Sequence, residues 1–410
     1  MLSKLSPFLV LKVTYFRNYL IGAFVSEIGN QMQIVAVAWQ VYEITKNPAA
    51  LGLIGLANII PILLFSLIGG LAADKLDRKK LLLISQLSQA FFASILFYLT
   101  ITHTINPLII YVMLVLIAIA QSFSLPARQA ILPNLVPKSL FMNAVSLNTL
   151  QFQSSIMLGP AIAGILIASL GISSVYFLNS LSFLFFILAV ITIKVPLNIE
   201  HKDIEFHISY ILEGIKFVLK TPILYSTMIL DFLATFFGTA TILMPIFAQD
   251  ILHVGPQGLG LLYSAPAIGG VIAGALMTFI HRVGNQGKMI IASIILYGLA
   301  IVGFGLSKVF IISIFFLVLM GFGDMVSTII RNTIRQMVTP DHLRGRMVSV
   351  MRIFFQGGPQ LGEIEAGFLA KAIGGPASVV VGGVGVVLIT TIIAFKSKAL
   401  RGYHGKELAV

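Results

Sequence analysis

Two stretches, LGPAIAGILIASLG at residues 158–171 and LGEIEAGFLAKAIG at residues 361–374, decide the fold of this chain because they repeat one pattern. They lie 203 residues apart, and the same offset aligns Arg128 with Arg331. A duplicated hydrophobic half within 410 residues is typical of membrane proteins that consist of two pseudo-symmetric helix bundles. The repeat therefore predicts two related six-helix halves.

The composition places the chain in a lipid bilayer. Hydrophobic residues make up 58% and charged residues only 10%, and the mean hydropathy is +0.99, so a water-soluble fold would expose too much apolar surface. The net charge of +12 comes without a long basic run interleaved with aromatic residues, which argues against a nucleic-acid partner. The absence of cysteine excludes disulfides, zinc–thiolate sites and thiol catalysis.

Twelve segments are long and apolar enough to be transmembrane helices, each of which needs about 20 residues. An even number places both termini on one side. Apart from Lys46, Lys308 and Lys371, all of the 27 Lys and Arg residues fall on that side, which the positive-inside rule identifies as the cytoplasm. The predicted spans are 18–44, 49–73, 80–102, 106–126, 140–170, 172–194, 222–250, 256–281, 287–306, 309–335, 346–374 and 376–396.

A charged segment midway between the repeats predicts the domain organisation. We expect an N-terminal bundle at 1–194, a cytoplasmic linker at 195–221, and a C-terminal bundle with a short cytoplasmic tail at 222–410. Within the linker, apolar residues recur at helical spacing opposite charged ones, which predicts an amphipathic helix on the inner membrane surface. It is expected to tether the bundles, with a regulatory role as the alternative.

Two carboxylates lie inside apolar spans at equivalent positions of the repeat. An offset of 204 aligns Glu27 with Asp231, and each lies about ten residues into its span, on the order of 15 Å deep. An ionised carboxylate at that depth costs several kcal/mol unless it is paired or hydrated, so both are candidates for proton coupling. The alternative is a permanent pair with an arginine. Asn30 and Gln31 extend the polar stripe from Glu27 and are candidates to line a substrate cavity.

The predicted eleventh span carries the largest difference between the copies, because Glu363 stands where the first copy has Pro160. Arg352, Gln356 and Glu363 share one helical face, which could contact a polar substrate or, at Glu363, a proton. Glu365 points roughly to the opposite side, so both glutamates cannot line one cavity.

The predicted tenth span has a second polar face, formed by Asp324, Thr328, Arg331 and Arg335. Its interpretation is either contact with substrate, through Asp324, or an internal network of ion pairs. Gln153 in the fifth span is a further candidate for the substrate cavity.

Several classes of chemistry have no support in the sequence. All seven histidines fall in predicted loops, tails or helix ends, which argues against a histidine proton relay or a metal site. No serine–histidine–acid arrangement or phosphate-binding glycine loop appears, so we expect neither an enzyme nor an ATP-driven pump, and no cofactor. Transport must then be driven by an ion gradient or by the substrate's own gradient.

The loop GLAADKLDRKK at 70–80 resembles motif A of the major facilitator superfamily, with Asp77 in place of the glycine common in that motif. The resemblance implies that Gly70 lets helices approach and that Asp74 and Arg78 latch a cytoplasmic gate. Arg128 and Arg331 are grouped with this gate, because both arginines lie towards the cytoplasmic ends of the predicted fourth and tenth spans.

Gly159, Pro160 and Gly164 are similar to motif C of exporters in this superfamily, a motif that bends a helix and permits close packing. The arginine-centred motif B of many drug/proton antiporters is absent from the middle of the predicted fourth span. Over nearly the whole chain, including TPDHLRGRMVSV at 339–350, the pattern resembles the branch with the enterobactin exporter and macrolide efflux pumps. The resemblance implies an all-α major facilitator fold of 12 transmembrane helices.

The leading hypothesis is a proton-coupled exporter, an antiporter, of small amphiphilic compounds such as a siderophore or drugs. It would work by alternating access as a monomer in the bacterial inner membrane, in contact with protons and membrane lipid. Two alternatives are a lysophospholipid flippase of the same fold and a transporter-like sensor without flux.

Overall fold

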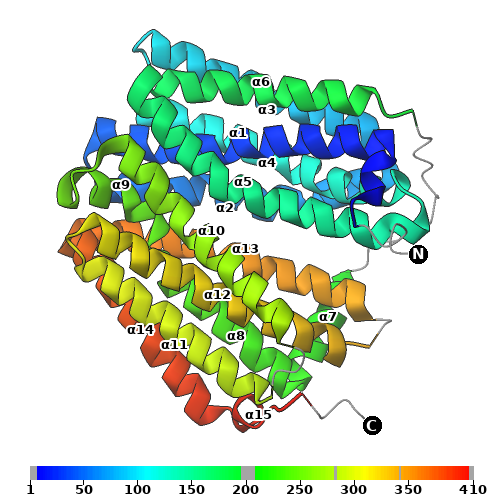
Figure 1. Cartoon of the computed structure of the whole chain (residues 1–410), viewed down its shortest axis with the longest axis vertical. Helices are drawn as coiled ribbons and strands as arrows, with labels where there is room; N and C mark the ends of the chain where they lie inside the picture. Colours follow the sequence, from blue (N-terminus) through cyan, green and yellow to red (C-terminus); the bar gives the residue numbers. More distant parts are fainter. Residues whose placement is uncertain (1–6, 195–207, 281–283, 341–342, 406–410) are drawn as a thin grey trace. The chain divides into compact units, whose positions relative to one another are not determined.

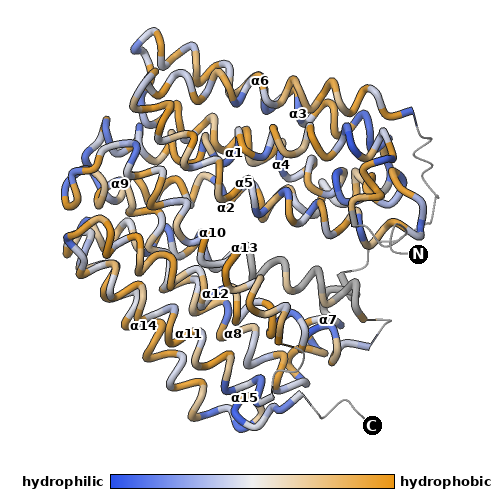
Figure 2. The backbone as a smooth tube through the Cα atoms, in the orientation of Figure 1, coloured by the Kyte–Doolittle hydropathy of each residue, from blue (hydrophilic) through white to orange (hydrophobic). Residues whose placement is uncertain are grey.

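The computed structural model describes residues 7–194, 208–280, 284–340 and 343–405, and every regular element in these ranges is helical (Figure 1). Eleven helices in the described residues are long and apolar enough to cross a membrane, which confirms an all-α membrane protein. The predicted eleventh span forms helix α13 (Arg344–Ile373), which is 30 residues long but is not one of these eleven. It is more polar than the others because it includes Gln360, Glu363 and Glu365. Hydrophobic residues dominate most of the remaining helices (Figure 2).

The helices cluster into two compact units. The first comprises the described residues of 1–46, 60–202 and 255–264. Its long helices are α1 (Thr14–Thr45), α3 (Arg78–Ile101), α4 (Pro107–Ile131), α5 (Phe141–Leu170) and α6 (Ile172–Ile191), joined by the second half of α2 (Pro48–Lys75) and the start of α10 (Gly255–Phe279).

The second unit comprises the described residues of 47–59, 203–254 and 265–410. The predicted division of the chain at a 195–221 linker stays a prediction, and residues 195–207 of it lie outside the described residues. Besides α13 and the remainder of α2 and α10, this unit contains α7 (Ile208–Lys220), α8 (Pro222–Phe237), α9 (Met244–Ile246), α11 (Gln286–Leu306), α12 (Phe310–Val338), α14 (Gly375–Lys396) and the short α15 (Lys398–Arg401).

The predicted span 222–250 is interrupted. Helix α8 ends at Phe237, and short 3₁₀, α and π segments continue from Thr241 to Ile251. At the break the Tyr297 hydroxyl donates to the Gly238 carbonyl at 3.0 Å, so a side chain satisfies a backbone group that the helix no longer bonds. Such a replacement is required wherever a helix is broken within a membrane.

Buried polar side chains link the helices of the first unit. Asn179 donates to Gln33 at 2.7 Å, the Tyr176 hydroxyl donates to Gln40 at 2.7 Å, and Gln86 donates to Ser124. Interhelical hydrogen bonds of this kind hold membrane helices together, where apolar burial supplies little specificity.

Two glycine contacts are equivalent under the repeat. In the first unit, Gly164 of α5 lies against Gly260 of α10, and in the second unit Gly367 of α13 lies against Gly52 of α2. A Cβ atom at any of the four positions would come within about 3.1 Å of the facing backbone, so these helices touch at their main chains.

Candidate functional site

The first unit places Glu27 of α1 beside Arg128 of α4. Arg128 Nη1 lies 3.9 Å from Glu27 Oε2, and the two side chains are 16% and 15% exposed. The Gln31 amide, one helical turn after Glu27, donates to Glu27 Oε1 at 3.1 Å. The carboxylate is therefore held by one short hydrogen bond and one long ion pair.

Arg128 has further contacts that do not depend on Glu27. Its Nη2 donates to the Ser26 hydroxyl at 3.4 Å, and the guanidinium carbon lies 4.5 Å from the centre of the Phe186 ring on α6. A cation over an aromatic face is stabilised by the ring quadrupole. Arg128 is thus positioned on α4 whether or not Glu27 is ionised.

The second unit holds Asp231 of α8 between two arginines of α12. Arg331 Nη1 lies 2.8 Å from Asp231 Oδ1, and Arg335 Nη2 lies 2.9 Å from Asp231 Oδ2. All three side chains are buried, with exposed fractions between 2% and 5%. Each carboxylate oxygen therefore lies beside a charged nitrogen, and Oδ2 accepts a hydrogen bond from Arg335.

The polar face of α12 continues along the helix from Arg331 to Thr328 and Asp324. Arg331 Nη2 lies 3.8 Å from Asp324 Oδ1, and the same nitrogen donates to the Thr328 hydroxyl at 2.9 Å. The Asp324 side chain is 51% exposed, so Asp324 is the accessible end of the network. Of the two interpretations of this face, an ion-pair network is the one that these distances support.

The acid–arginine pair of one unit is formed by residues that the repeat aligns with those of the pair in the other unit. Glu27 and Asp231 occupy equivalent positions, and so do their partners Arg128 and Arg331, which sequence reasoning grouped with the gate. Sequence reasoning named a permanent pair with an arginine as the alternative, but it did not identify which arginine. A usable signal was present, since offsets of 204 and 203 residues relate the two carboxylates and the two arginines.

The loop between α2 and α3 is held by backbone contacts. Arg78 donates from Nε to the Ala73 carbonyl at 3.3 Å and from Nη1 to the Ala130 carbonyl of α4 at 3.2 Å. Asp77 caps α3 by accepting from the backbone N–H groups of Lys79 and Lys80, so the residue that departs from motif A has a structural role. The Asp74 side chain lies outside the described residues.

Helix α2 packs closely against α4 at Gly69, and the predicted role of Gly70 in letting helices approach stays a prediction. A Cβ on Gly69 would collide with the Ser122 carbonyl of α4, whereas one on Gly70 would meet no described atom within 4 Å. In α5, Gly159 fits against Gln31 of α1, and Gly164 fits against α10. Helix α5 continues through Pro160.

Three candidates are partly buried and form no hydrogen bond or ion pair with another described residue: Asn30, Gln153 and Glu363. Glu363 packs against Gly55 of α2, whose missing side chain makes room for the carboxylate. The side chains of Arg352 and Gln356 lie outside the described residues. Within the described ranges, no group of three or more His, Cys, Asp or Glu residues is arranged to hold a metal.

Comparison with known proteins agrees with this architecture. The chain is 27% identical to the multidrug efflux pump Tap of Mycolicibacterium fortuitum, with 87% of this chain and 89% of Tap covered. It is 25% identical to the staphyloferrin A transporter of Staphylococcus aureus, covering 93% and 96%. It is 26% identical to the enterobactin exporter EntS of Salmonella typhimurium, covering 95% and 94%.

A solved structure shares the fold at low sequence identity. The bacterial homologue of the human lysosomal transporter Spinster superimposes with a TM-score of 0.74 at 13% identity, with 95% of this chain and 98% of that chain covered. Residues 3–408 match the family described as transmembrane secretion effector. The chain therefore belongs to this family of the major facilitator superfamily and is a multi-pass membrane transporter, not an enzyme.

Proposed function

We propose that this transporter exports a small amphiphilic compound, a siderophore or a drug, in exchange for protons. It would work by alternating access in the bacterial inner membrane, with both termini in the cytoplasm. Relatives named as a multidrug efflux pump, a siderophore transporter and a siderophore exporter support the export of such compounds. The basic residues gathered on one predicted side of the membrane support the orientation.

The main support for proton coupling at Glu27 is the weak contact between its carboxylate and Arg128. Its ion pair with Arg128 is 3.9 Å long, and both side chains are partly exposed, so a proton or a substrate group can reach the carboxylate. A substrate group that donates a hydrogen bond, or that is positively charged, would bind ionised Glu27. Protonation would remove that interaction, so proton and substrate would exchange at one carboxylate.

Asp231 has a different role in this proposal. Two buried arginines lie 2.8 and 2.9 Å from its carboxylate oxygens, and a group held in that way is suited to fixing α8 against α12. Glu363 remains the second candidate for proton coupling, because it is partly buried and lacks a polar partner among the described residues.

Transport by purified protein in proteoliposomes tests the coupling. Enterobactin and ethidium are loaded separately, and their flux is measured with and without a pH gradient. Glu27→Gln should lower gradient-driven flux at least about five-fold, the lower end of typical coupling between sites. Glu43→Gln is the matched control, because Glu43 is an exposed carboxylate on the same helix.

The Glu363→Gln variant, assayed in the same way, separates the two candidates. If Glu27→Gln responds to the pH gradient as the unmodified protein does while Glu363→Gln does not, the coupling group is Glu363. If neither substrate responds to a gradient in any variant, proton antiport is wrong.

The gate is tested through Arg78, whose guanidinium holds the Ala73 and Ala130 carbonyls. Arg78→Gln should slow transport of either substrate without abolishing its binding, because the loop would lose its tie to α4. Transport at the unmodified rate would remove Arg78 from the proposed latch.

A further inference from the structure

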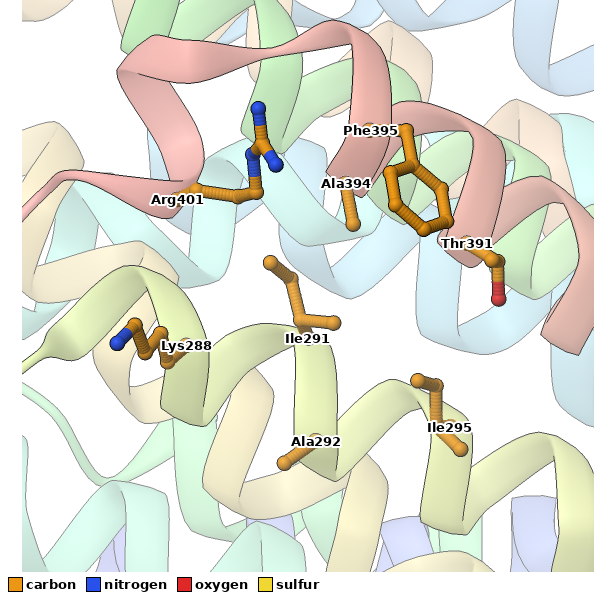
Figure 3. Close-up of a pocket in the computed structure, with 8 residues that line it drawn as sticks. All are labelled: Lys288, Ile291, Ala292, Ile295, Thr391, Ala394, Phe395 and Arg401. Carbon is orange, nitrogen blue, oxygen red and sulfur yellow. The ribbon is translucent and has the colours of Figure 1, made fainter.

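A pocket lies between α11 and α14 in the second unit (Figure 3), and none of the residues that line it belongs to the acid–arginine centre of α8 and α12. Its volume is about 340 Å³. Between the two cationic residues at the helix ends and the far end of the pocket, the lining is apolar apart from Thr391. The apolar lining residues are Ile291, Ala292, Ile295, Ala394 and Phe395. Apolar walls alone are expected of any groove that faces lipid, so they do not identify an occupant.

Two cations distinguish this pocket from an ordinary lipid-facing groove. Lys288 and Arg401 line it, and Figure 3 shows both on the same side of the apolar residues. Lys288 lies in the first turn of α11 and Arg401 ends α15, shortly after α14. Both side chains therefore stand where two neighbouring helices leave the membrane.

The turn that carries Arg401 is held in place against α11. The Gly287 N–H donates to the Tyr403 carbonyl at 3.1 Å, and a Cβ on Gly287 would collide with the Leu400 carbonyl. The Leu400 side chain is fully buried, and Ser397 caps α15 by accepting from the Leu400 N–H. Arg401 is thus presented on an anchored turn.

The positive charges of Lys288 and Arg401 have no acidic counterpart on the helices that form the pocket. Helices α11, α14 and α15 contain no Asp or Glu. Neither Lys288 nor Arg401 forms an ion pair with any residue that the structure describes. An anion from the surroundings can therefore balance this charge, and at the end of a membrane helix the abundant anion is a lipid headgroup.

We infer that this pocket binds an anionic phospholipid. The phosphate of the headgroup lies between Lys288 and Arg401, and one acyl chain follows the apolar walls between α11 and α14 towards the membrane interior. None of the residues that line the pocket has a part in the proposed coupling, so lipid binding here does not depend on which compound the protein exports.

Lipid binding to the full chain tests this inference. Purified protein in detergent is titrated with dioleoylphosphatidylglycerol or dioleoylphosphatidylcholine, and bound lipid is counted by native mass spectrometry. The anionic lipid should bind more tightly. Lys288→Gln with Arg401→Gln should weaken it by about 30-fold, which is about five-fold for each cation.

The matched control is Lys396→Gln with Lys398→Gln. It removes the same charge from the same end of α14 and α15, but these lysines do not line the pocket. We expect it to weaken binding less than about three-fold. An equal loss in both double variants would show that only diffuse charge attracts the lipid, and would overturn the site.

The apolar wall is tested without changing charge. Ala292→Phe should fill the pocket and lower phosphatidylglycerol binding, whereas Ala275→Phe, at an exposed alanine of α10, should not. Unchanged binding in Ala292→Phe, or equal binding of phosphatidylcholine and phosphatidylglycerol to the unmodified protein, would overturn the inference.

Discussion

The two acid–arginine centres occupy equivalent positions of the repeat but differ in how tightly they are held. In the first unit, Glu27 has one arginine at 3.9 Å and an amide donor. In the second, Asp231 has two arginines at 2.8 and 2.9 Å and is almost fully buried. One ancestral arrangement has therefore become a loose, accessible pair in one half and a closed triad in the other.

Single residues explain the difference. At the 203-residue offset, Arg335 corresponds to Leu132, so the first unit lacks the second arginine. Phe186, which covers Arg128, corresponds to Ile389, so the second unit lacks the aromatic cap. The arginine at this position gives Asp231 a second charged neighbour, which Glu27 lacks.

The largest effect on stability should come from Asp231→Asn. The change leaves Arg331 and Arg335 buried side by side without a counter-charge, and removal of one partner from a buried pair costs about 3–5 kcal/mol. Thermal unfolding of the purified protein measures the loss. A variant as stable as the unmodified protein would show that the triad does not anchor α8.

A smaller loss is expected from Arg335→Met, which makes the second centre resemble the first. Asp231 loses the 2.9 Å donor to its Oδ2 but keeps Arg331 beside its Oδ1, and a hydrogen bond to a charged group contributes about 1.5–3 kcal/mol. Lys398→Met, which removes an exposed cation, serves as the control in the same unfolding assay. Equal effects of the two variants would contradict the role of Arg335.

The sequence predicted the helical membrane fold, because hydrophobic length and the repeat are local or periodic signals. It also indicated both carboxylates as candidate site residues, and their role in coupling stays a prediction. It did not predict the partners of those carboxylates. Contact between α1 and α4, or between α8 and α12, depends on how helices pack around one another, and single-sequence patterns do not specify that. Arg331 and Arg335 share one face of α12, yet nothing in the spacing indicates that both turn towards α8.

The break after α8 was missed for a related reason. Residues 222–250 are mostly apolar, which predicts one continuous span. At the interruption the Gly238 carbonyl accepts from the Ala240 N–H and from the hydroxyl of Tyr297 in α11, which is 59 positions away in the chain. Long-range satisfaction of a backbone carbonyl has no local signature.

Phe186→Leu should remove the aromatic ring that covers Arg128 in the first centre and that the second centre lacks. Loss of the cation–π contact with Arg128 and of ring packing should lower stability by about 1–2 kcal/mol. Phe185→Leu is the control, since the Phe185 side chain is 47% exposed on the same helix. If both variants lose the same stability, the ring does not hold Arg128.

The smallest effect on stability should come from Glu27→Gln, although this variant has the largest expected effect on coupling. Arg128 would keep Ser26 and Phe186, and a partly exposed ion pair at 3.9 Å contributes less than about 1 kcal/mol. A double-mutant cycle with Arg128→Gln measures the Glu27–Arg128 term directly. An interaction as large as that expected at Asp231 would mean that Glu27 is also a fixed anchor. The two centres would then be alike, and the proton would have to be carried elsewhere, with Glu363 as the remaining candidate.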